Sequence, residues 1–204
     1  MKLPANRELL EELPIDYFGF IFHPGSPRFV GTQEEEILLK LFNTPKFRTG
    51  VFVDVSPAEI FRRAGKYNLT HIQLHGRETP DECEEIGRNG CKVIKSFSVH
   101  PDFDFSVCFP YVGKCDFFLF DTKGKQPGGT GEKFNWQVLS DYRLEIPFFL
   151  SGGISPGDES AILRLNHPFF FGIDLNSCFE NAPGVKNVEK LKIFLRNISN
   201  GEIM

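Results

Sequence analysis

The feature that most constrains the fold is a series of seven short runs rich in β-branched and aromatic residues, most of them apolar at nearly every position. They cover residues 17–22, 50–54, 71–75, 92–99, 117–121, 147–151 and 169–175. Continuous apolar runs are typical of strands buried on both faces, as in parallel sheets covered by helices. The runs recur roughly every 20 to 30 residues with helix-like stretches between them, which predicts a parallel α/β fold. An open doubly wound sheet and a closed barrel both satisfy this pattern.

Helix starts can be placed between several of these strands. Ser56-Pro57 and Thr79-Pro80 each combine an N-cap residue with proline at the first helical position, and the segment 155–158 could open a third helix. The last helix is expected over 188–198. The chain opens with a helix-like segment, 6–13, before its first strand. A complete barrel needs eight strands, and only seven are predicted.

Composition and short motifs argue against several classes of protein. The formal net charge is −4 and no basic run occurs, which disfavours a nucleic-acid partner. No apolar run approaches the roughly 20 residues of a membrane helix, and polar residues follow Met1, so we expect no membrane partner and a cytoplasmic location. The five cysteines include no C-x-x-C pair, which disfavours disulfides and zinc. No G-x-G-x-x-G follows the first strand, which disfavours dinucleotide binding. No linker interrupts the pattern, so we expect one domain over residues 1–204.

A phosphate site is predicted after the last two strands. Ligands of parallel α/β folds bind at the carboxyl ends of the strands. Gly152 and Gly153 follow the sixth strand and precede a helix, and the turn Asp174 to Ser177 follows the seventh. Glycines there let a phosphate approach backbone N–H groups near a helix N-terminus. The alternative is that the two glycines only make a tight turn.

Asp121 ends an otherwise apolar strand. A carboxyl beside apolar walls can have a raised pKa and act as a general acid. The alternative, an Asp that caps the following turn, is about as well supported by the residues alone. The next segment, 123–131, contains four glycines, so it could close over a substrate or form a plain surface loop.

Three further side chains are candidates for the same rim. Arg28 follows the first strand, and its guanidinium suits a carboxylate or phosphate, although an exposed Arg without a role is the commoner case. Gln73 and His75 are two residues apart on one strand, so both side chains point the same way. Two polar side chains that point into a barrel indicate a binding site more often than an accidental polar pair in the core. His23 has no predicted partner, so no functional role is assigned to it.

Together these motifs resemble the phosphoribosylanthranilate isomerase family. The matching segments, in chain order, are 19–28 with its Ser-Pro-Arg, 50–53, the Gln-Leu-His-Gly of 73–76, Asp121-Thr122, the Gly-Gly-Thr-Gly of 128–131 with Phe134 and Trp136, 151–153, and 174–177 with Pro183-Gly184. The resemblance runs from Tyr17 to the end of the chain. The set is specific as a set, although each piece alone is weak.

The resemblance implies a (β/α)8 TIM barrel of the ribulose-phosphate-binding type and an Amadori rearrangement in tryptophan biosynthesis. The substrate would be N-(5-phosphoribosyl)anthranilate, and no metal or organic cofactor would be needed. The enzyme could form a homodimer. Asp121 would be the general acid, and Arg28 would hold the anthranilate carboxylate. The substrate-binding residues would also include Gln73 and His75, while the phosphate would be surrounded, largely by backbone N–H groups, by Gly152, Gly153, Asp174, Asn176 and Ser177.

One family element is missing from this sequence. The family's general base is a Cys in a K-x-C-G segment that ends the first strand, and no such segment occurs here. Either the full protein begins upstream of Met1 and carries that strand, or this is a seven-stranded chain with little isomerase activity. Loss of a general base costs on the order of 10²–10⁴ in rate. A non-catalytic phosphosugar-binding barrel is therefore the second hypothesis. An indole-glycerol-phosphate synthase is the third, with Lys95 as its one candidate lysine.

Overall fold

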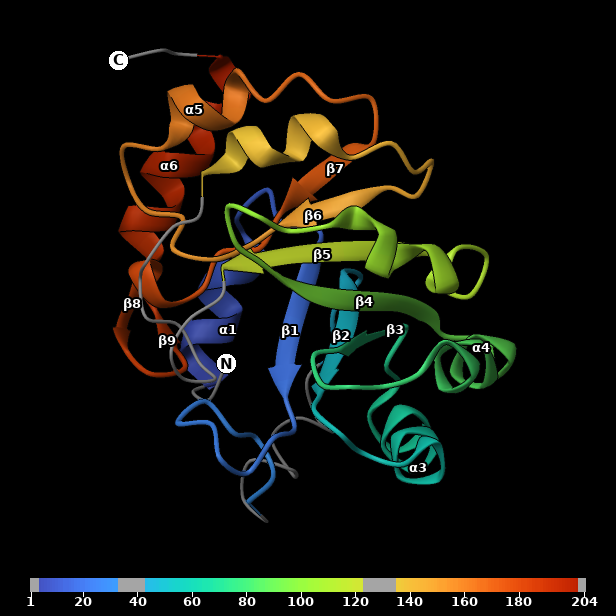
Figure 1. The fold of residues 1–204 in the computed structure, drawn as a ribbon. Coiled ribbons are helices and arrows are strands. Elements are labelled where there is room, and N and C mark those ends of the chain that lie inside the picture. The colour runs from blue at the N-terminus through green and yellow to red at the C-terminus, as the bar shows by residue number, and fades with distance from the viewer. Residues whose placement is uncertain (1–3, 33–42, 123–134, 202–204) are drawn as a thin grey trace.

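The computed structural model describes residues 4–32, 43–122 and 135–201, which form one curled parallel sheet with helices outside it (Figure 1). The strands are β1 (Tyr17–Ile21), β2 (Phe47–Phe52), β3 (His71–Leu74), β4 (Lys92–Val99), β5 (Phe117–Thr122), β6 (Phe148–Leu150) and β7 (Phe170–Ile173). They pair in the order β1 to β7, each neighbour parallel. All seven predicted strands are confirmed, with shifts of a few residues at their ends.

The strand order separates the two architectures that the sequence left open. A doubly wound sheet reverses its order at a switch point, which places helices on both faces. Here the order is consecutive, so right-handed crossovers place the helices that connect the strands on one face, and the sheet curls with its described helices outside. β1 and β7 are the two ends of the ladder, and among the described residues no pairing joins them.

The helices are α1 (Pro4–Glu11), α3 (Pro57–Tyr67), α4 (Pro80–Arg88), α5 (Glu159–Leu163) and α6 (Val188–Asn200). The crossovers after β4 and β5 use the 3₁₀ segments η1 (Phe105–Tyr111) and η2 (Trp136–Asp141), and a third, η3 (Ser177–Phe179), leads into a small hairpin of β8 (Glu180–Ala182) and β9 (Val185–Lys186). No helix of the described segments is long and apolar enough to span a membrane.

Helices follow all three predicted start segments, although the capping differs from one to the next. Thr79 closes a full capping box with Glu82 at the start of α4. Ser56 precedes α3 with proline at its first position, although its hydroxyl makes no capping bond. The segment 155–158 precedes α5, as predicted, but Asp158 and not Ser155 is the N-cap residue. Asp158 accepts hydrogen bonds from the Ser155 N–H and hydroxyl, which makes a turn, and α5 begins only at Glu159.

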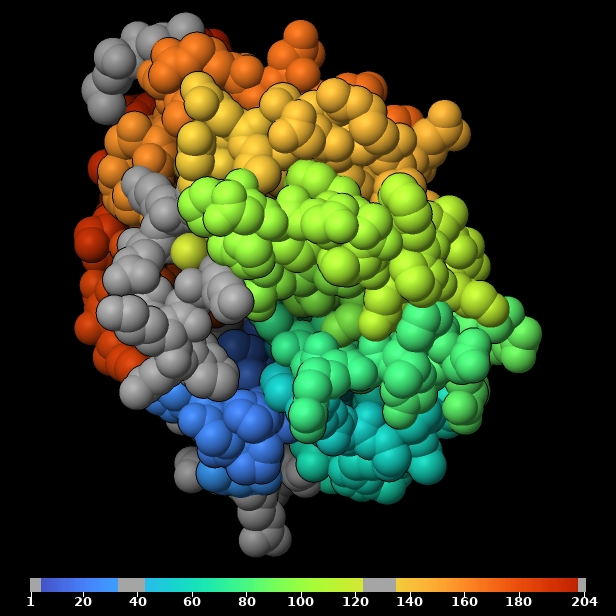
Figure 2. Space-filling model, viewed as in Figure 1, coloured from blue at the N-terminus to red at the C-terminus, as the bar shows by residue number. Residues whose placement is uncertain are grey.

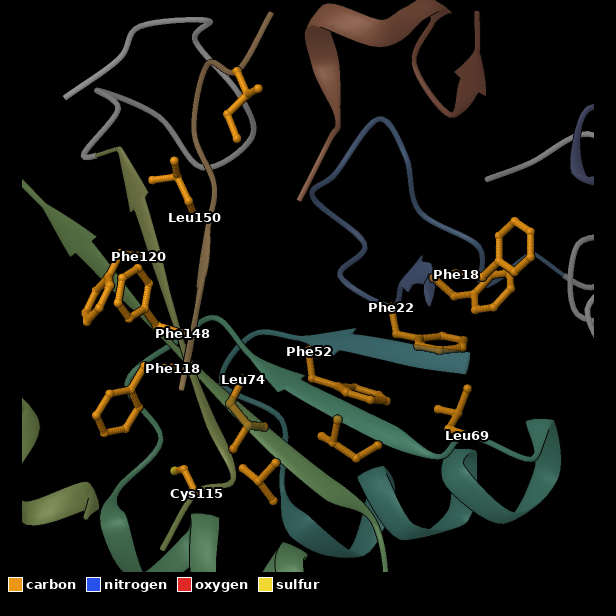
Figure 3. Packing of buried hydrophobic residues seen from close by; sticks show 14 of the residues in the cluster. Phe18, Phe22, Phe52, Leu69, Leu74, Cys115, Phe118, Phe120, Phe148 and Leu150 are labelled. Carbon is orange, nitrogen blue, oxygen red and sulfur yellow. The ribbon is translucent and has the colours of Figure 1, made fainter. Parts of the chain in front are cut away.

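The main core lies between the sheet and its helices. It holds most of the buried phenylalanines, of which Phe18, Phe22, Phe52, Phe118, Phe120 and Phe148 are labelled in Figure 3. Phe22 stacks on Phe52 and Tyr67 at 5.2 and 5.4 Å between ring centroids. A smaller cluster fills the concave side, where Ile94, Leu119 and Phe149 meet. In the space-filling view, the segments from α3 to η1 form a continuous surface (Figure 2).

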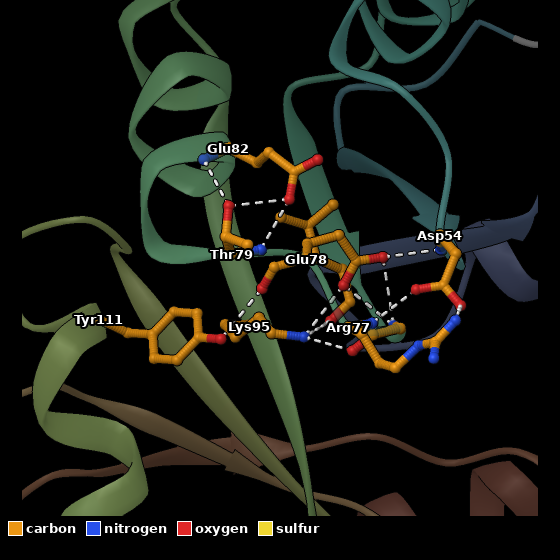
Figure 4. A network of polar contacts seen from close by, with 9 residues as sticks. Asp54, Arg77, Glu78, Thr79, Glu82, Lys95 and Tyr111 are labelled. Atoms are coloured by element: carbon orange, nitrogen blue, oxygen red, sulfur yellow. Dashed lines mark hydrogen bonds and ion pairs between the residues drawn. The ribbon is translucent and has the colours of Figure 1, made fainter.

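A buried ion pair ties the loops after β2 and β3 together (Figure 4). Lys95 Nζ lies 3.0 Å from Glu78 Oε2, and both side chains are only 3% exposed. The ammonium also donates to the Gly76 carbonyl, and Glu78 accepts from the backbone N–H groups of Asp54 and Gly76. All these partners of the ion pair are therefore protein groups. The residues paired with Lys95 on the neighbouring strands, Leu74 and Phe118, belong to the main core between the sheet and its helices. This lysine faces the helices, so it does not supply the catalytic lysine that the synthase hypothesis needs.

Replacing Lys95 with Met should destabilise the fold strongly. The substitution leaves the Glu78 carboxylate buried without its cation, which typically costs about 3–5 kcal/mol. Urea unfolding measures the loss. The control, Arg88→Met, removes the exposed partner of Glu84 on α4 and should shift the midpoint much less. Equal losses in the two variants would contradict a structural role for the buried pair.

Candidate active site

Asp121 and His75 form the centre of the polar rim at the carboxyl ends of the strands. The Asp121 Oδ2 lies 3.3 Å from the His75 Nε2, and the two side chains are 27% and 30% exposed. The other carboxylate oxygen accepts the N–H of Thr122 at 2.9 Å. The capping interpretation of Asp121 is thus partly right, since one oxygen holds the turn. The second oxygen is turned toward His75, where it can exchange a proton with a ligand.

Asp174 extends this centre toward β7. The Gln73 side chain, 5% exposed, donates a hydrogen bond to the Asp174 carboxylate. Burial raises the pKa of Asp174, nearby Asp121 raises it further, and the cation of Lys186 opposes the shift. The Asp174 N–H already donates to the Leu150 carbonyl at 2.8 Å. That N–H is therefore used by the sheet, and the place of Asp174 beside a phosphate stays a prediction.

Gly152 brings the loop after β6 against Asp121 and Thr122. Its φ is +88°, and a Cβ at this position would lie 2.2 Å from Thr122 Oγ1 and 2.7 Å from Asp121 Oδ1. Gly153, at φ +67°, continues the turn. Only glycine allows this approach of backbone to carboxylate. The expected support from a following helix N-terminus is absent at these two glycines, because α5 begins only at Glu159.

The loops after β6 and β7 meet as predicted. Asn176 precedes η3, which begins at Ser177, and the Cys178 thiol donates to the Gly153 carbonyl at 3.9 Å. The two candidate phosphate loops are therefore neighbours. All five cysteines are free thiols, and among the described residues no group of three His, Cys, Asp or Glu side chains could hold a metal ion. The predicted lid, 123–131, lies outside the described residues.

Arg28 is not an exposed arginine without a partner, which was the alternative left open by the sequence. It is 8% exposed, and its guanidinium is paired with Glu180 at 2.7 Å between Nη2 and Oε2. Glu180 also meets Lys186 at 3.2 Å. The sequence analysis did not single out Glu180 or Lys186, which lie on the β8–β9 hairpin. The available signal was two charged residues flanking the Pro183-Gly184 turn, directly after the Asp174 to Ser177 motif.

The fold and the rim together define a class: single-wound parallel α/β proteins with a polar site at the carboxyl ends of the strands. The sequence profile described as "N-(5'phosphoribosyl)anthranilate (PRA) isomerase" matches residues 7–197. The chain belongs to the N-(5'-phosphoribosyl)anthranilate isomerase family.

Relatives from two bacteria match nearly the whole chain. The isomerase of Parabacteroides distasonis is 40% identical over 206 residues, which cover 97% of this chain and 90% of the relative. That of Phocaeicola vulgatus is 41% identical over 198 residues, covering 97% and 94%.

Solved structures agree with the fold. Phosphoribosylanthranilate isomerase from Thermotoga maritima superimposes with a TM-score of 0.85 at 29% identity, over 98% of this chain and 96% of that one. An isomerase in complex with reduced 1-(o-carboxyphenylamino)-1-deoxyribulose 5-phosphate gives 0.82 at 27% identity, over 98% and 95%.

Replacing Asp174 with Asn should stabilise the protein at neutral pH. Because the pKa of Asp174 is raised on folding, stability falls as pH rises from the unfolded value, about 3.9, through the folded value. The variant should therefore unfold at higher urea concentration at pH 7, and the difference should vanish near pH 3. The exposed Asp141→Asn variant is the control, with no gain expected. A lower midpoint for Asp174→Asn at pH 7 would contradict the sign.

Proposed function

We propose that this chain binds N-(5-phosphoribosyl)anthranilate and supplies the general acid for its Amadori rearrangement, an isomerisation in tryptophan biosynthesis. The observation that carries the proposal is the meeting of Asp121 with His75 and Gly152 at one rim, beside the loops expected to hold a phosphate. Family membership supports the reaction, and the rim supports the assignment of roles.

In this proposal Asp121 protonates the ribose ring oxygen, so that the C1–O bond breaks and the ring opens to a protonated Schiff base. A base then removes the proton from C2, which gives an enolamine, and this tautomerises to the ketone. His75, 3.3 Å from the Asp121 carboxylate, would orient that acid. The ligand phosphate would lie at the N–H groups of Gly152, Gly153, Asn176 and Ser177, and Arg28 would face the anthranilate carboxylate.

We propose further that the seven strands are part of an eight-stranded barrel in which the remaining strand lies between β7 and β1. The consecutive order supports this, since its two ends are the strands that such an addition would join. Two phenylalanine rings on the concave side of the sheet also support an added strand. Phe47 of β2 and Phe171 of β7 contact inner rings, yet they remain 47% and 51% exposed. An added strand with the family's K-x-C-G end would bring the base to the rim.

The second candidate function is ligand binding without turnover. It is favoured by one observation: no cysteine of this sequence stands in a K-x-C-G segment like that of the family's base, whereas the candidate binding residues are all present in the sequence. Cys178, whose thiol is at the Gly153 carbonyl, lies at the expected phosphate end rather than beside C2. A cytoplasmic location and a homodimer are also part of the proposal. A structure of monomers made from the dimeric Thermotoga maritima isomerase, TM-score 0.80, is the precedent for the dimer.

Turnover of N-(5-phosphoribosyl)anthranilate distinguishes the two functions. We expect the chain extended at its N-terminus by an apolar strand ending in Lys-x-Cys-Gly to exceed the present chain by about 10²–10⁴ in rate. The same extension with Ala for Cys is the matched control and should give no gain. Asp121→Asn in the extended chain should remove the gain. Equal activity with and without the Cys, or an active Asp121→Asn variant, would contradict the assigned roles.

A further inference from the structure

One edge of the Arg28 guanidinium is bound by the buried carboxylate of Glu180. Its Nε lies 3.1 and 2.9 Å from the two Glu180 oxygens, and its Nη2 lies 2.7 Å from Oε2. The Arg28 side chain is 10% exposed and that of Glu180 is 4% exposed. This side-on contact uses Nε and one N–H of Nη2. The opposite edge, formed by Nη1 and the second N–H of Nη2, has the fork geometry that fits another carboxylate.

Glu180 is itself held from three directions. Besides Arg28, its Oε1 accepts from the Gly184 N–H and from Lys186 Nζ, both at 3.2 Å. Glu180 and Lys186 are register partners across the β8–β9 hairpin. Burial alone would raise the pKa of Glu180, but Arg28 and Lys186 together hold that pKa below its ordinary value. The carboxylate therefore stays ionised, as a fixed anchor for the arginine.

Lys186 connects this anchor to the opposite end of the site. Its Nζ donates to the Leu175 carbonyl at 3.1 Å and to Asn176 Oδ1 at 2.8 Å, in the loop after β7. The Asn6 side chain of α1 pairs with the Lys186 backbone at both its N–H and its carbonyl. The hairpin is thus fixed at one side to the candidate phosphate loop and at the other to Arg28.

We propose that Glu180 is a positioning residue, which orients Arg28 so that its outer edge receives the ring carboxylate of the ligand. The inference rests on the proposed function and deepens it. The Glu180–Lys186 hairpin sets the spacing between the arginine and the loop after β7. The site is therefore selective for molecules that carry an aryl carboxylate and a phosphate at that spacing. A Glu180 that merely competed with the ligand for Arg28 would have the opposite effect, since its removal would tighten binding.

Two probes test this by calorimetry: reduced 1-(o-carboxyphenylamino)-1-deoxyribulose 5-phosphate and the same compound without the ring carboxylate. The unmodified chain should prefer the carboxylated probe. Arg28→Met should abolish that preference. Glu180→Gln should reduce it about tenfold while binding the second probe nearly as before, because a misaligned arginine affects only the carboxylate contact. Glu189→Gln, an exposed carboxylate on α6, is the matched control and should keep the full preference.

The outcomes separate the two levels of the proposal. If the unmodified chain shows no preference or binds neither probe, the proposed function fails and this inference fails with it. If the preference exists and Glu180→Gln keeps it, weakens both probes equally or binds more tightly, only the positioning role is overturned. Glu180→Asp retains the charge with a shorter reach. It should show the same selective loss, and it provides the test if the Gln variant does not fold.

Discussion

Every feature of the site depends on one constraint, the consecutive parallel pairing of β1 to β7. Parallel neighbours place all carboxyl ends on the same rim, and a consecutive order leaves the concave side free of helices. Residues far apart in sequence therefore meet there. Asp121 and His75 come from strands that are not neighbours in the ladder, yet their side chains are 3.3 Å apart. A flat sheet would separate the ends of β3 and β5 by two strand spacings, whereas curling brings them within reach.

Two buried ion pairs serve this rim in different ways. Lys95 and Glu78 lie on the helix side of the sheet, where all their partners are internal, and they hold the loop that follows His75. Glu180 lies beside the rim and grips only one edge of Arg28. Burial of charge is costly unless the charge is paired. The first pair satisfies that demand completely, while the second leaves an arginine edge available. This difference favours a structural role for the first pair and is consistent with the binding role proposed for Arg28.

The sequence predicted the sheet well because each strand is a continuous apolar run, which needs no knowledge of distant contacts. Lys92–Val99 was predicted to the residue. The pairing of Gln73 and His75 on one face followed from strand periodicity alone. Other features depended on tertiary contacts and could not be predicted locally. Ser155-Pro156 has the pattern of a helix start, but the Asp158 carboxylate closes a turn there instead. Glu180 and Lys186 were missed because their partners are Arg28, 152 residues away, and a loop carbonyl.

The curled sheet and its polar rim support the proposed binding more completely than the proposed catalysis. The candidate acid and the candidate phosphate loops lie at the rim, whereas the sequence contains no K-x-C-G segment. The central claim is therefore the pose of the ligand. A crystal structure of the chain with reduced 1-(o-carboxyphenylamino)-1-deoxyribulose 5-phosphate tests it most directly. The account predicts the phosphate at Gly152, Gly153 and the Asn176 loop, the ring carboxylate at the outer edge of Arg28, and a ribulose oxygen beside Asp121. A ligand bound away from the rim, or with its carboxylate remote from Arg28, would contradict it.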